Sequence, residues 1–445
     1  MTHPLVLPEL VPEYADTQQF PTAQKAQRGI VAGVVGNILE WYDFALFGFF
    51  APQIGAHFFP ANNATASTLA AFGTFAAGFL MRPVGGAFFG WIGDRYGRKQ
   101  ELLGSVLAMA FPSFFIALLP DVATIGVIAT VLLVLFRLIQ GVAVGGEYMA
   151  SAVFLVEGSA AGRRGWMGSW GPFGASAGIL LGSASGWLIN LMLTPEQVMA
   201  WGWRVPFAIG LLVALGGLWV RAHYVEKKPL QQTAKAPLRE AFTSHWRTLI
   251  LLVFLAAGVS ISFYTTFVYS ATWLQQVAGV SGTTSLGINT IAMSVLLVVN
   301  PLSGWLSDRY GRRPLLIAGA LGMTLLAYPL MLLMQTGSWA AILAGQSGLA
   351  VLLGLYGGTL PAAMAELTPW RVRCTVLSVG YNLSLAILGG TTPLVATWLV
   401  ARTGWSMAPA VYFAAGASLA LLAALRFPRV VPHPMTREFS AVMPR

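Results

Sequence analysis

"GWIGDRYGRK" occupies residues Gly90 to Lys99, and the closely similar "GWLSDRYGRR" occupies residues Gly304 to Arg313. Each copy is a short charged segment bracketed by glycines, and each interrupts a long apolar stretch. A chain that carries such a turn twice, far apart, is built from an internal repeat. The repeated turn therefore predicts two related halves, each with its charged segment at an equivalent place.

The composition places these apolar stretches in a membrane. Of the 445 residues, 56% are hydrophobic and 9% are charged, against roughly 25% charged residues in ordinary soluble domains. A helix needs about 20 apolar residues to cross about 30 Å of hydrocarbon. The sequence predicts an all-α polytopic membrane protein with twelve transmembrane helices, at 28–52, 66–92, 101–119, 122–155, 166–191, 205–221, 249–275, 283–306, 314–335, 340–362, 374–400 and 407–426.

The basic residues predict the orientation in the membrane. With the N-terminus inside, nearly all lysines and arginines outside the spans fall in cytoplasmic segments, as the positive-inside rule requires. The net charge of +10 is then topological, and no nucleic-acid partner is expected. We expect both termini to be cytoplasmic and the membrane to be a bacterial inner membrane. The first 24 residues are polar and proline-punctuated, unlike a cleavable signal.

A second recurrence supports the division into halves. Glu157 precedes Arg164 by seven residues, and Glu366 precedes Arg373 by the same interval. Because the two halves repeat in the same orientation, we expect a bundle of two six-helix units that rock around a midplane site. The expected segments are an N-terminal half at 1–221, a cytoplasmic linker at 222–246, a C-terminal half at 247–426 and a short cytoplasmic tail at 427–445.

Several motifs carry a family resemblance over residues 28–426. The paired turns resemble the signature loop of the major facilitator superfamily, and four further motifs are similar to its metabolite:proton symporter family. The resemblance implies proton-driven uptake of a carboxylate-bearing metabolite, such as α-ketoglutarate, citrate, shikimate, proline or betaine. The four motifs are "GNILEWYDF" (Gly36–Phe44), "FLMRPVGG" (Phe79–Gly86), "RLIQGVAVGGEY" (Arg137–Tyr148) and "WGWRVPF" (Trp201–Phe207).

Charged residues inside the spans are the candidates for proton coupling, because each costs at least about 2.5 kcal/mol to insert. Glu40 and Asp43 lie three residues apart on one helical face, where two acids disfavour simultaneous ionisation, and one of them could carry a proton. The alternative is a structural pair that neutralises an arginine. Arg137 matches the superfamily's fourth-span motif, which implies an influence on proton transfer. Glu147, nearer the cytoplasm, suits coupling or gating.

Arg82 is the best candidate for receiving a substrate anion. It lies about 16 Å along a helix from the first charged turn, near the bilayer midplane. Its guanidinium can bind a carboxylate with two parallel hydrogen bonds. The alternative is a permanent ion pair with a first-span acid. From the second half, Tyr264, Tyr381 and Asn382 are candidates for the other side of the substrate site, although helical aromatics more often serve packing.

The two charged turns predict a cytoplasmic gate. Each turn places an aspartate at the end of one helix and an arginine at the start of the next, on the face where a glutamate emerges. Networks of such pairs can tip a carrier that is poised between two states, although single surface pairs contribute only about 0 to 1 kcal/mol. The alternative is that these charges only fix topology. The cytoplasmic gate is expected to contain Asp94, Arg98 and Glu157, with Asp308, Arg312 and Glu366 as its repeat.

No motif in the sequence predicts enzymatic chemistry. "GASAG" around Ser176 matches a hydrolase pattern formally, but no span supplies a histidine base. Glycines recur at every fourth position from Gly174 to Gly186, as in close helix packing. The single cysteine, Cys374, excludes an intrachain disulfide and a cysteine metal cluster. We therefore expect no enzyme, cofactor or metal.

The resulting expectation is a monomeric symporter that takes up a small metabolite with protons, with an organic acid of the di- or tricarboxylate type favoured. The alternatives are a symporter of proline- or betaine-type zwitterions and, less favoured, a proton-coupled antiporter. A sensor would carry a signalling domain, and the tail after Arg426 is short.

Overall fold

The computed structural model describes residues 23–222 and 237–428, apart from residues 62, 97, 146, 158, 370 and 371. The described secondary structure is helical throughout. The helices before the gap at 223–236, here called the N-terminal helices, are α1 (Ala23–Phe49), α2 (Ala51–Phe58), α3 (Ala64–Leu80), α4 (Arg82–Tyr96), α5 (Arg98–Leu118), α6 (Val122–Ile125), α7 (Val127–Val144), α8 (Glu147–Glu157), η1 (Ala161–Arg163), α9 (Arg164–Gly168), α10 (Trp170–Met192), α11 (Pro195–Gln197), η2 (Val198–Gly202) and α12 (Arg204–Ala222).

The helices after the gap are here called the C-terminal helices. They are α13 (Pro237–Thr243), α14 (Trp246–Phe263), η3 (Tyr264–Tyr269), α15 (Ser270–Val277), α16 (Gly282–Tyr310), α17 (Arg312–Gln335), α18 (Trp339–Gly357), α19 (Leu360–Leu367), α20 (Arg373–Ser384), η5 (Leu385–Gly389), α21 (Thr392–Thr403) and α22 (Ala408–Leu425).

Every expected span is helical in the structure. Within the described ranges, nine helical stretches are long and apolar enough to cross a membrane. The three remaining expected spans correspond to α1, α5 and α12. The expected span at 122–155 differs from one continuous helix, because it is divided into α6, α7 and α8, with Gly126 at φ +65° between the first two.

Polar caps and glycines set the helix ends. The side chain of Asn63 accepts a hydrogen bond from the Ala66 N–H at the start of α3, and Ser281 does the same for Thr284 at the start of α16. The second charged turn contains Gly311, whose φ of +89° lets the chain reverse between α16 and α17. The turn is therefore a sharp helix–helix corner, as its glycine indicates.

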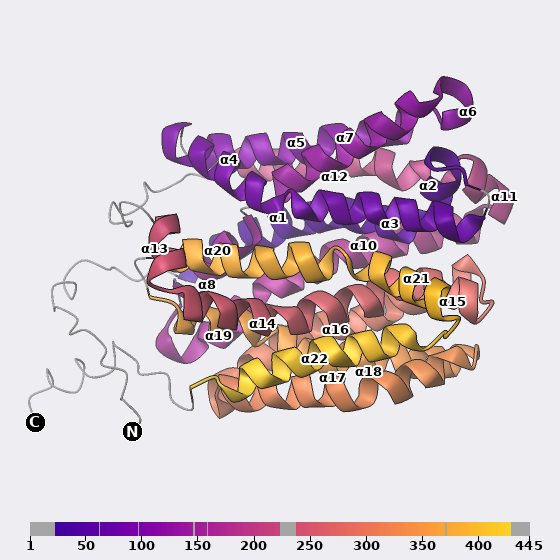
Figure 1. The fold of residues 1–445 in the computed structure, drawn as a ribbon. Coiled ribbons are helices and arrows are strands. Elements are labelled where there is room, and N and C mark those ends of the chain that lie inside the picture. The colour runs from indigo at the N-terminus through magenta and orange to yellow at the C-terminus, as the bar shows by residue number, and fades with distance from the viewer. Residues whose placement is uncertain are drawn as a thin grey trace, which may run out of the picture.

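The long helices run nearly parallel, and most N-terminal helices lie in the upper part of Figure 1 and most C-terminal helices in the lower part, while α8 lies below α20 and packs against α19 and α20. α10 packs against both α1 and α16, so it belongs to the interface between the two groups. A methyl group added at Gly178 would collide with the carbonyl oxygen of Ile38 on α1, and one added at Gly182 would make a tight contact with the carbonyl oxygen of Tyr42 at 3.3 Å. The predicted packing role of this glycine stripe is confirmed.

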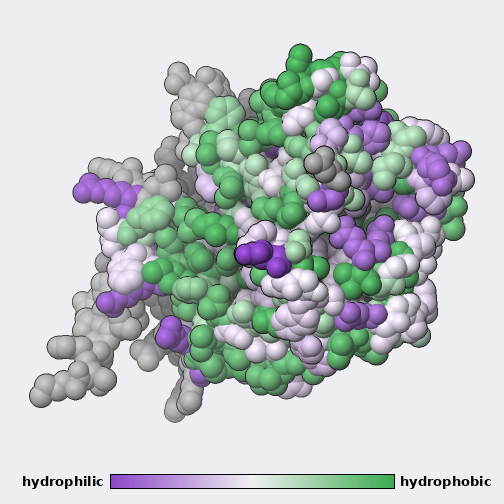
Figure 2. All heavy atoms as spheres, turned by 45° about the vertical axis from the view of Figure 1, so that its right-hand side comes forward, coloured by the Kyte–Doolittle hydropathy of each residue, from purple (hydrophilic) through white to green (hydrophobic). Residues whose placement is uncertain are grey.

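The surface has the pattern of a membrane protein. Large apolar side chains such as Val127, Leu191 and Leu212 are more than 60% exposed. Figure 2 shows hydrophobic residues over much of the flank, while hydrophilic ones gather toward the end of the bundle that carries α6, α11 and α15 in Figure 1. Exposed apolar surface of this extent marks contact with lipid.

Candidate substrate cavity and cytoplasmic gate

A cavity of about 50 Å³ lies between the N-terminal and C-terminal helices. α1, α8 and α10 line it on one side, and α14, η3, α16, α18, α19, α20 and η5 line it on the other. None of the described residues in its lining is charged. Its aromatic lining residues are Trp41, Tyr148, Phe263, Tyr264 and Tyr381, and its two other polar side chains are Ser176 and Asn300.

Aromatic rings from both sides meet at one wall of this cavity. Tyr148 on α8 stacks on Tyr381 on α20, with ring centroids 5.0 Å apart and an interplanar angle of 26°. Trp41 meets the ring of Tyr148 edge-on at 5.9 Å. Tyr264 contacts the ring of Phe79 edge-on at 5.3 Å. The structure thus places two predicted substrate residues, Tyr264 and Tyr381, in the cavity lining.

Arg82 lies next to this wall rather than in the cavity lining. Its side chain is buried, and its Cζ lies 5.4 Å from the centroid of the Trp41 ring. Its Nε donates to Asn382 Oδ1 at 3.0 Å, and its Nη2 lies 3.9 Å from Glu40 Oε1. Asn382 Nδ2 in turn donates to the Gly145 carbonyl at 2.7 Å. Three predicted site residues are therefore brought together, and Asn382 links α20 to the N-terminal helices.

Asp43 faces a different set of partners from Glu40. Arg137 Nη1 donates to Gln140 Oε1 at 2.7 Å, and Gln140 Nε2 donates to Ser113 Oγ at 2.6 Å. Ser113 also hydrogen-bonds the Asp43 carboxylate. All four side chains are buried within the N-terminal helices. The two acids thus belong to separate polar clusters, one around Arg82 beside the cavity and one around Arg137.

Aromatic faces surround the Arg137 guanidinium. Its Cζ lies 4.4 Å from the centroid of the Phe44 ring and 4.3 Å from that of Phe47. Such contacts stabilise a cation by interaction with the ring quadrupole. The side chain of Glu147, predicted to act in coupling, lies outside the described residues.

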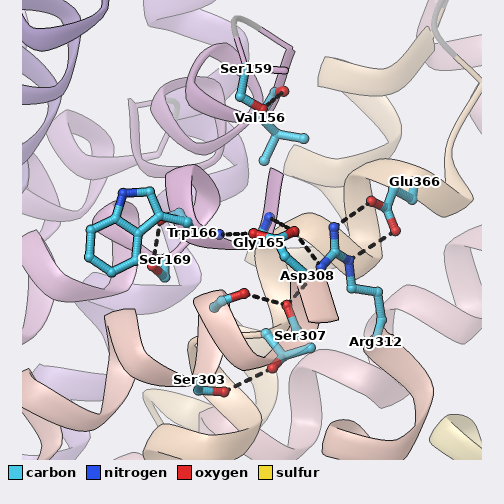
Figure 3. Close-up of polar contacts among 12 residues, drawn as sticks. Val156, Ser159, Gly165, Trp166, Ser169, Ser303, Ser307, Asp308, Arg312 and Glu366 are labelled. Carbon is cyan, nitrogen blue, oxygen red and sulfur yellow. Dashed lines mark hydrogen bonds and ion pairs between the residues drawn. The ribbon is translucent and has the colours of Figure 1, made fainter. Parts of the chain in front are cut away.

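The second half of the predicted cytoplasmic gate is assembled (Figure 3). Asp308 accepts backbone hydrogen bonds from the N–H groups of Gly165 and Trp166, both at 2.8 Å. Arg312 Nη1 pairs with Asp308 Oδ1 at 2.7 Å, and Nη2 pairs with Glu366 Oε1 at 2.9 Å. Asp308 thus joins α16 to the start of α9, across the boundary between the two groups of helices.

The first half of the gate shows one described contact that the sequence did not predict. Glu157 Oε1 pairs with Arg373 Nη1 at 2.6 Å, so its described partner belongs to the C-terminal helices. The side chains of Asp94 and Arg98, its expected partners, lie outside the described residues. Sequence reasoning noted the equal Glu–Arg spacing of the two halves, but it did not assign this pairing across them.

Other site residues were not predicted. Trp41, Tyr148, Phe263 and Asn300 line the cavity, although only the first two lie within motifs singled out for the family resemblance. Ser176, set aside as a false hydrolase match, also lines the cavity and accepts a hydrogen bond from Asn300 Nδ2 at 3.2 Å. Apart from the family motifs that contain Trp41 and Tyr148, the sequence gave no signal that distinguishes these residues from residues that serve packing.

The family model of the Major Facilitator Superfamily matches residues 33–369 and 287–441. The chain belongs to the major facilitator superfamily. It is therefore a membrane transporter and not an enzyme, as the repeated turns predicted.

Several relatives of the chain are named as transporters of proline and betaine. The chain is 35% identical to the proline/betaine transporter of Salmonella typhimurium, over 92% of its own length and 85% of that protein. It is 34% identical to a glycine betaine/proline/ectoine/pipecolic acid transporter of Dickeya dadantii, with the same coverage. It is 35% identical to a putative proline/betaine transporter of Staphylococcus aureus, over 88% of its own length and 86% of that protein.

Solved structures support the fold. A D-xylose-proton symporter superposes with a TM-score of 0.73 at 21% identity, over 91% of this chain and 98% of that one. The xylose transporter XylE of E. coli, in a partially occluded inward-open conformation, gives a TM-score of 0.71 at 18% identity, over 91% of this chain and 97% of that one. These similarities confirm the major facilitator fold.

Proposed function

We propose that this transporter takes up a small zwitterion of the proline or betaine type together with protons, across a bacterial inner membrane. The observation that carries the proposal is the absence of charged residues from the described lining of the cavity. Moving an ion into a buried site without a paired charge is costly. A zwitterion has no net charge, whereas a di- or tricarboxylate would bring two or three unbalanced charges into an apolar, aromatic cavity.

The named relatives support this choice. All three are called transporters of proline, betaine or related zwitterions. The organic-acid preference expected from the sequence finds no support among them, so the zwitterion alternative becomes the main proposal.

Arg82 stays a candidate for contact with the substrate carboxylate. Its Nε donates to Asn382, but Nη1 and Nη2 make no hydrogen bond to a described residue, so a carboxylate could bind there without displacing Asn382. Because Asn382 also donates to the Gly145 carbonyl, a substrate bound to Arg82 would lie beside a contact between the two groups of helices. Tyr264 and Tyr381 belong to the proposed substrate site as cavity-lining residues.

For the proton we propose Asp43 as the first candidate and Glu40 as the second. Asp43 is buried and contacts neutral Ser113, and Gln140 joins its cluster to Arg137. A carboxylate in such a place can hold a proton reversibly while the cavity binds substrate. Glu40 Oε1 lies 3.9 Å from Arg82 Nη2, as expected of a structural pair that neutralises the arginine. Glu147 remains a third candidate.

We propose that residues 1–221 and 247–426 form two halves that rock against each other, joined by the cytoplasmic linker 222–246, with both termini and the tail 427–445 in the cytoplasm. The cytoplasmic gate would be closed while the carrier faces outward. The contacts of Asp308 with α9 and of Glu157 with Arg373 support this, since each joins the two halves. The carrier would work as a monomer.

Transport into proteoliposomes tests the proposal. Purified protein is reconstituted, an inward proton gradient is imposed, and labelled glycine betaine, L-proline, citrate and α-ketoglutarate are compared. We expect accumulation of the zwitterions above equilibrium and its loss on adding an uncoupler. Accumulation of citrate or α-ketoglutarate without the zwitterions would contradict the proposal, and zwitterion exchange that ignores the gradient would contradict proton coupling.

A further inference from the structure

One end of the cavity offers hydrogen-bond donors from both halves of the protein. Asn300 on α16 and Ser176 on α10 are buried and are joined by the hydrogen bond from Asn300 Nδ2 to Ser176 Oγ at 3.2 Å. A side-chain amide carries two N–H donors, and a serine hydroxyl that accepts one bond still has its own O–H donor. The pair therefore has one amide hydrogen and one hydroxyl hydrogen with which to bind a carboxylate.

Another wall of the cavity is made of aromatic rings. Tyr148 and Tyr381 stack there at 5.0 Å, with Trp41 edge-on to Tyr148 at 5.9 Å. The faces of such rings attract a cation that lies within about 6 Å of their centroids. The Arg82 guanidinium already lies over the Trp41 ring, at 5.4 Å from its centroid, so Tyr148 and Tyr381 are the rings left for a substrate cation.

No carboxylate is present among the described residues of the cavity lining. Their side-chain oxygens are the neutral hydroxyls of three tyrosines and Ser176 and the neutral amide of Asn300. A secondary ammonium, such as that of proline, carries two N–H donors that lose their water on binding, and a buried donor without a good acceptor weakens binding. A quaternary ammonium carries no N–H group and presents methyl groups to the rings.

We propose that, in the arrangement seen here with Arg82 held by Asn382, the cavity binds its zwitterion with the carboxylate on Asn300 and Ser176 instead of on Arg82 and the ammonium on the rings of Tyr148 and Tyr381, and that it selects for N-methylation. This inference rests on the proposed function, in which the cargo is a zwitterion. Because Tyr148 and Ser176 come from one half and Tyr381 and Asn300 from the other, the bound substrate contacts both halves at each of its ends.

The decisive measurement compares ligands that differ only in N-methylation. L-proline and N,N-dimethyl-L-proline share ring and carboxylate, and glycine betaine and N,N-dimethylglycine form a second pair. Affinities are measured by calorimetry on the full chain in lipid nanodiscs. We expect the quaternary member of each pair to bind roughly tenfold more tightly, which corresponds to about 1.4 kcal/mol. Equal affinities, or tighter binding of the less methylated member, would overturn the inference.

Variants locate the two ends of the substrate. Tyr381→Leu should bring the affinity ratio of each pair close to one, whereas Tyr381→Phe keeps the ring and should keep the ratio. Asn300→Leu should weaken both members of a pair by the same factor and leave the ratio unchanged. Tyr328→Leu, which removes a 38% exposed tyrosine of α17, is the matched control and should change neither affinity.

The outcomes separate this inference from the proposed function. If the affinity ratio of each pair is unchanged in Tyr381→Leu, or is lost in Asn300→Leu, the ammonium lies elsewhere. Either result would refute the proposed orientation of the substrate. If both members of each pair bind equally well, the inference fails while the zwitterion proposal stands. If neither member binds and citrate does, the proposed function itself fails. Because the wild-type chain alone gives the ratio, a variant that does not fold leaves the test intact.

Discussion

Replacing Asp308 with asparagine removes a charge from the cytoplasmic gate while keeping the shape of the side chain. In the native chain the two carboxylate oxygens each accept a backbone hydrogen bond at 2.8 Å, one from Gly165 and one from Trp166. Oδ1 also pairs with Arg312 at 2.7 Å. Asparagine offers one oxygen and one NH2 group, so one of the two backbone N–H groups would face another donor.

The structure sets the size of the effect. Hydrogen bonds to a charged group contribute about 1.5 to 3 kcal/mol each. Asp308 and Arg312 are both more than 90% buried, so solvent screens their interaction little. Losing one charged bond and weakening the other two should cost the closed gate about 2 to 3 kcal/mol. That is roughly a 30- to 150-fold shift toward the inward-open state.

Double electron–electron resonance can measure this shift. Cys374, which is exposed, is first replaced by serine, and spin labels are placed at Gly162 and Tyr310, which are exposed beside the gate on opposite halves. Asp308→Asn should move the distance distribution to longer values and slow uptake. Asp121→Asn is the control, since Asp121 caps α6 far from the gate. Identical distributions with and without Asp308→Asn would refute the gate and leave these charges a topological role.

Three further predictions follow from the buried contacts. Arg82→Lys keeps the charge but loses the planar donors that hold Asn382, so uptake should fall at least tenfold. The amount of protein in the membrane should stay the same. An unchanged apparent affinity for the substrate would show that Arg82 does not belong to the substrate site. Asp43→Asn should abolish accumulation of substrate against a gradient but still permit exchange of substrate across the membrane, measured by counterflow. Glu40→Gln should reduce accumulation less completely. If both variants still concentrate substrate, the group that carries the proton lies elsewhere. Gly178→Val should lower the melting temperature, because a side chain there would collide with the Ile38 carbonyl oxygen. An unchanged melting temperature would mean that α1 and α10 can move apart without a loss of stability.

The fold could be predicted because its determinants are local. Apolar length predicts each span, and Gly311 predicts the corner between α16 and α17 within one turn of chain. The small-residue stripe from Gly174 to Gly186 predicts a close helix contact, although the sequence does not say that α1 is the partner. Where Gly126 separates the short helix α6 from α7, hydropathy alone predicted one continuous span.

The site was only partly predictable, because it depends on which helices face each other. Charge marked Arg82, Glu40 and Asp43 as unusual inside a membrane, and all three are buried in polar clusters. Nothing in the sequence distinguishes Tyr148 or Asn300 from residues that serve packing. Their position in the cavity comes from the approach of α8 to α20 and of α10 to α16, which are contacts between distant parts of the chain.

The repeated turn explains why the two halves of the gate need different partners. If each copy contacted only its own half, the turns would stabilise the halves separately and leave their relative position unaffected. Instead Asp308 of the second copy binds the backbone of α9, and Glu157, the last residue of α8 in the first half, pairs with Arg373. In the proposed rocking motion, contacts that cross the interface from both directions would be broken when the halves separate at this end. A duplicated sequence can therefore act as a gate only because each half offers its charges to the other.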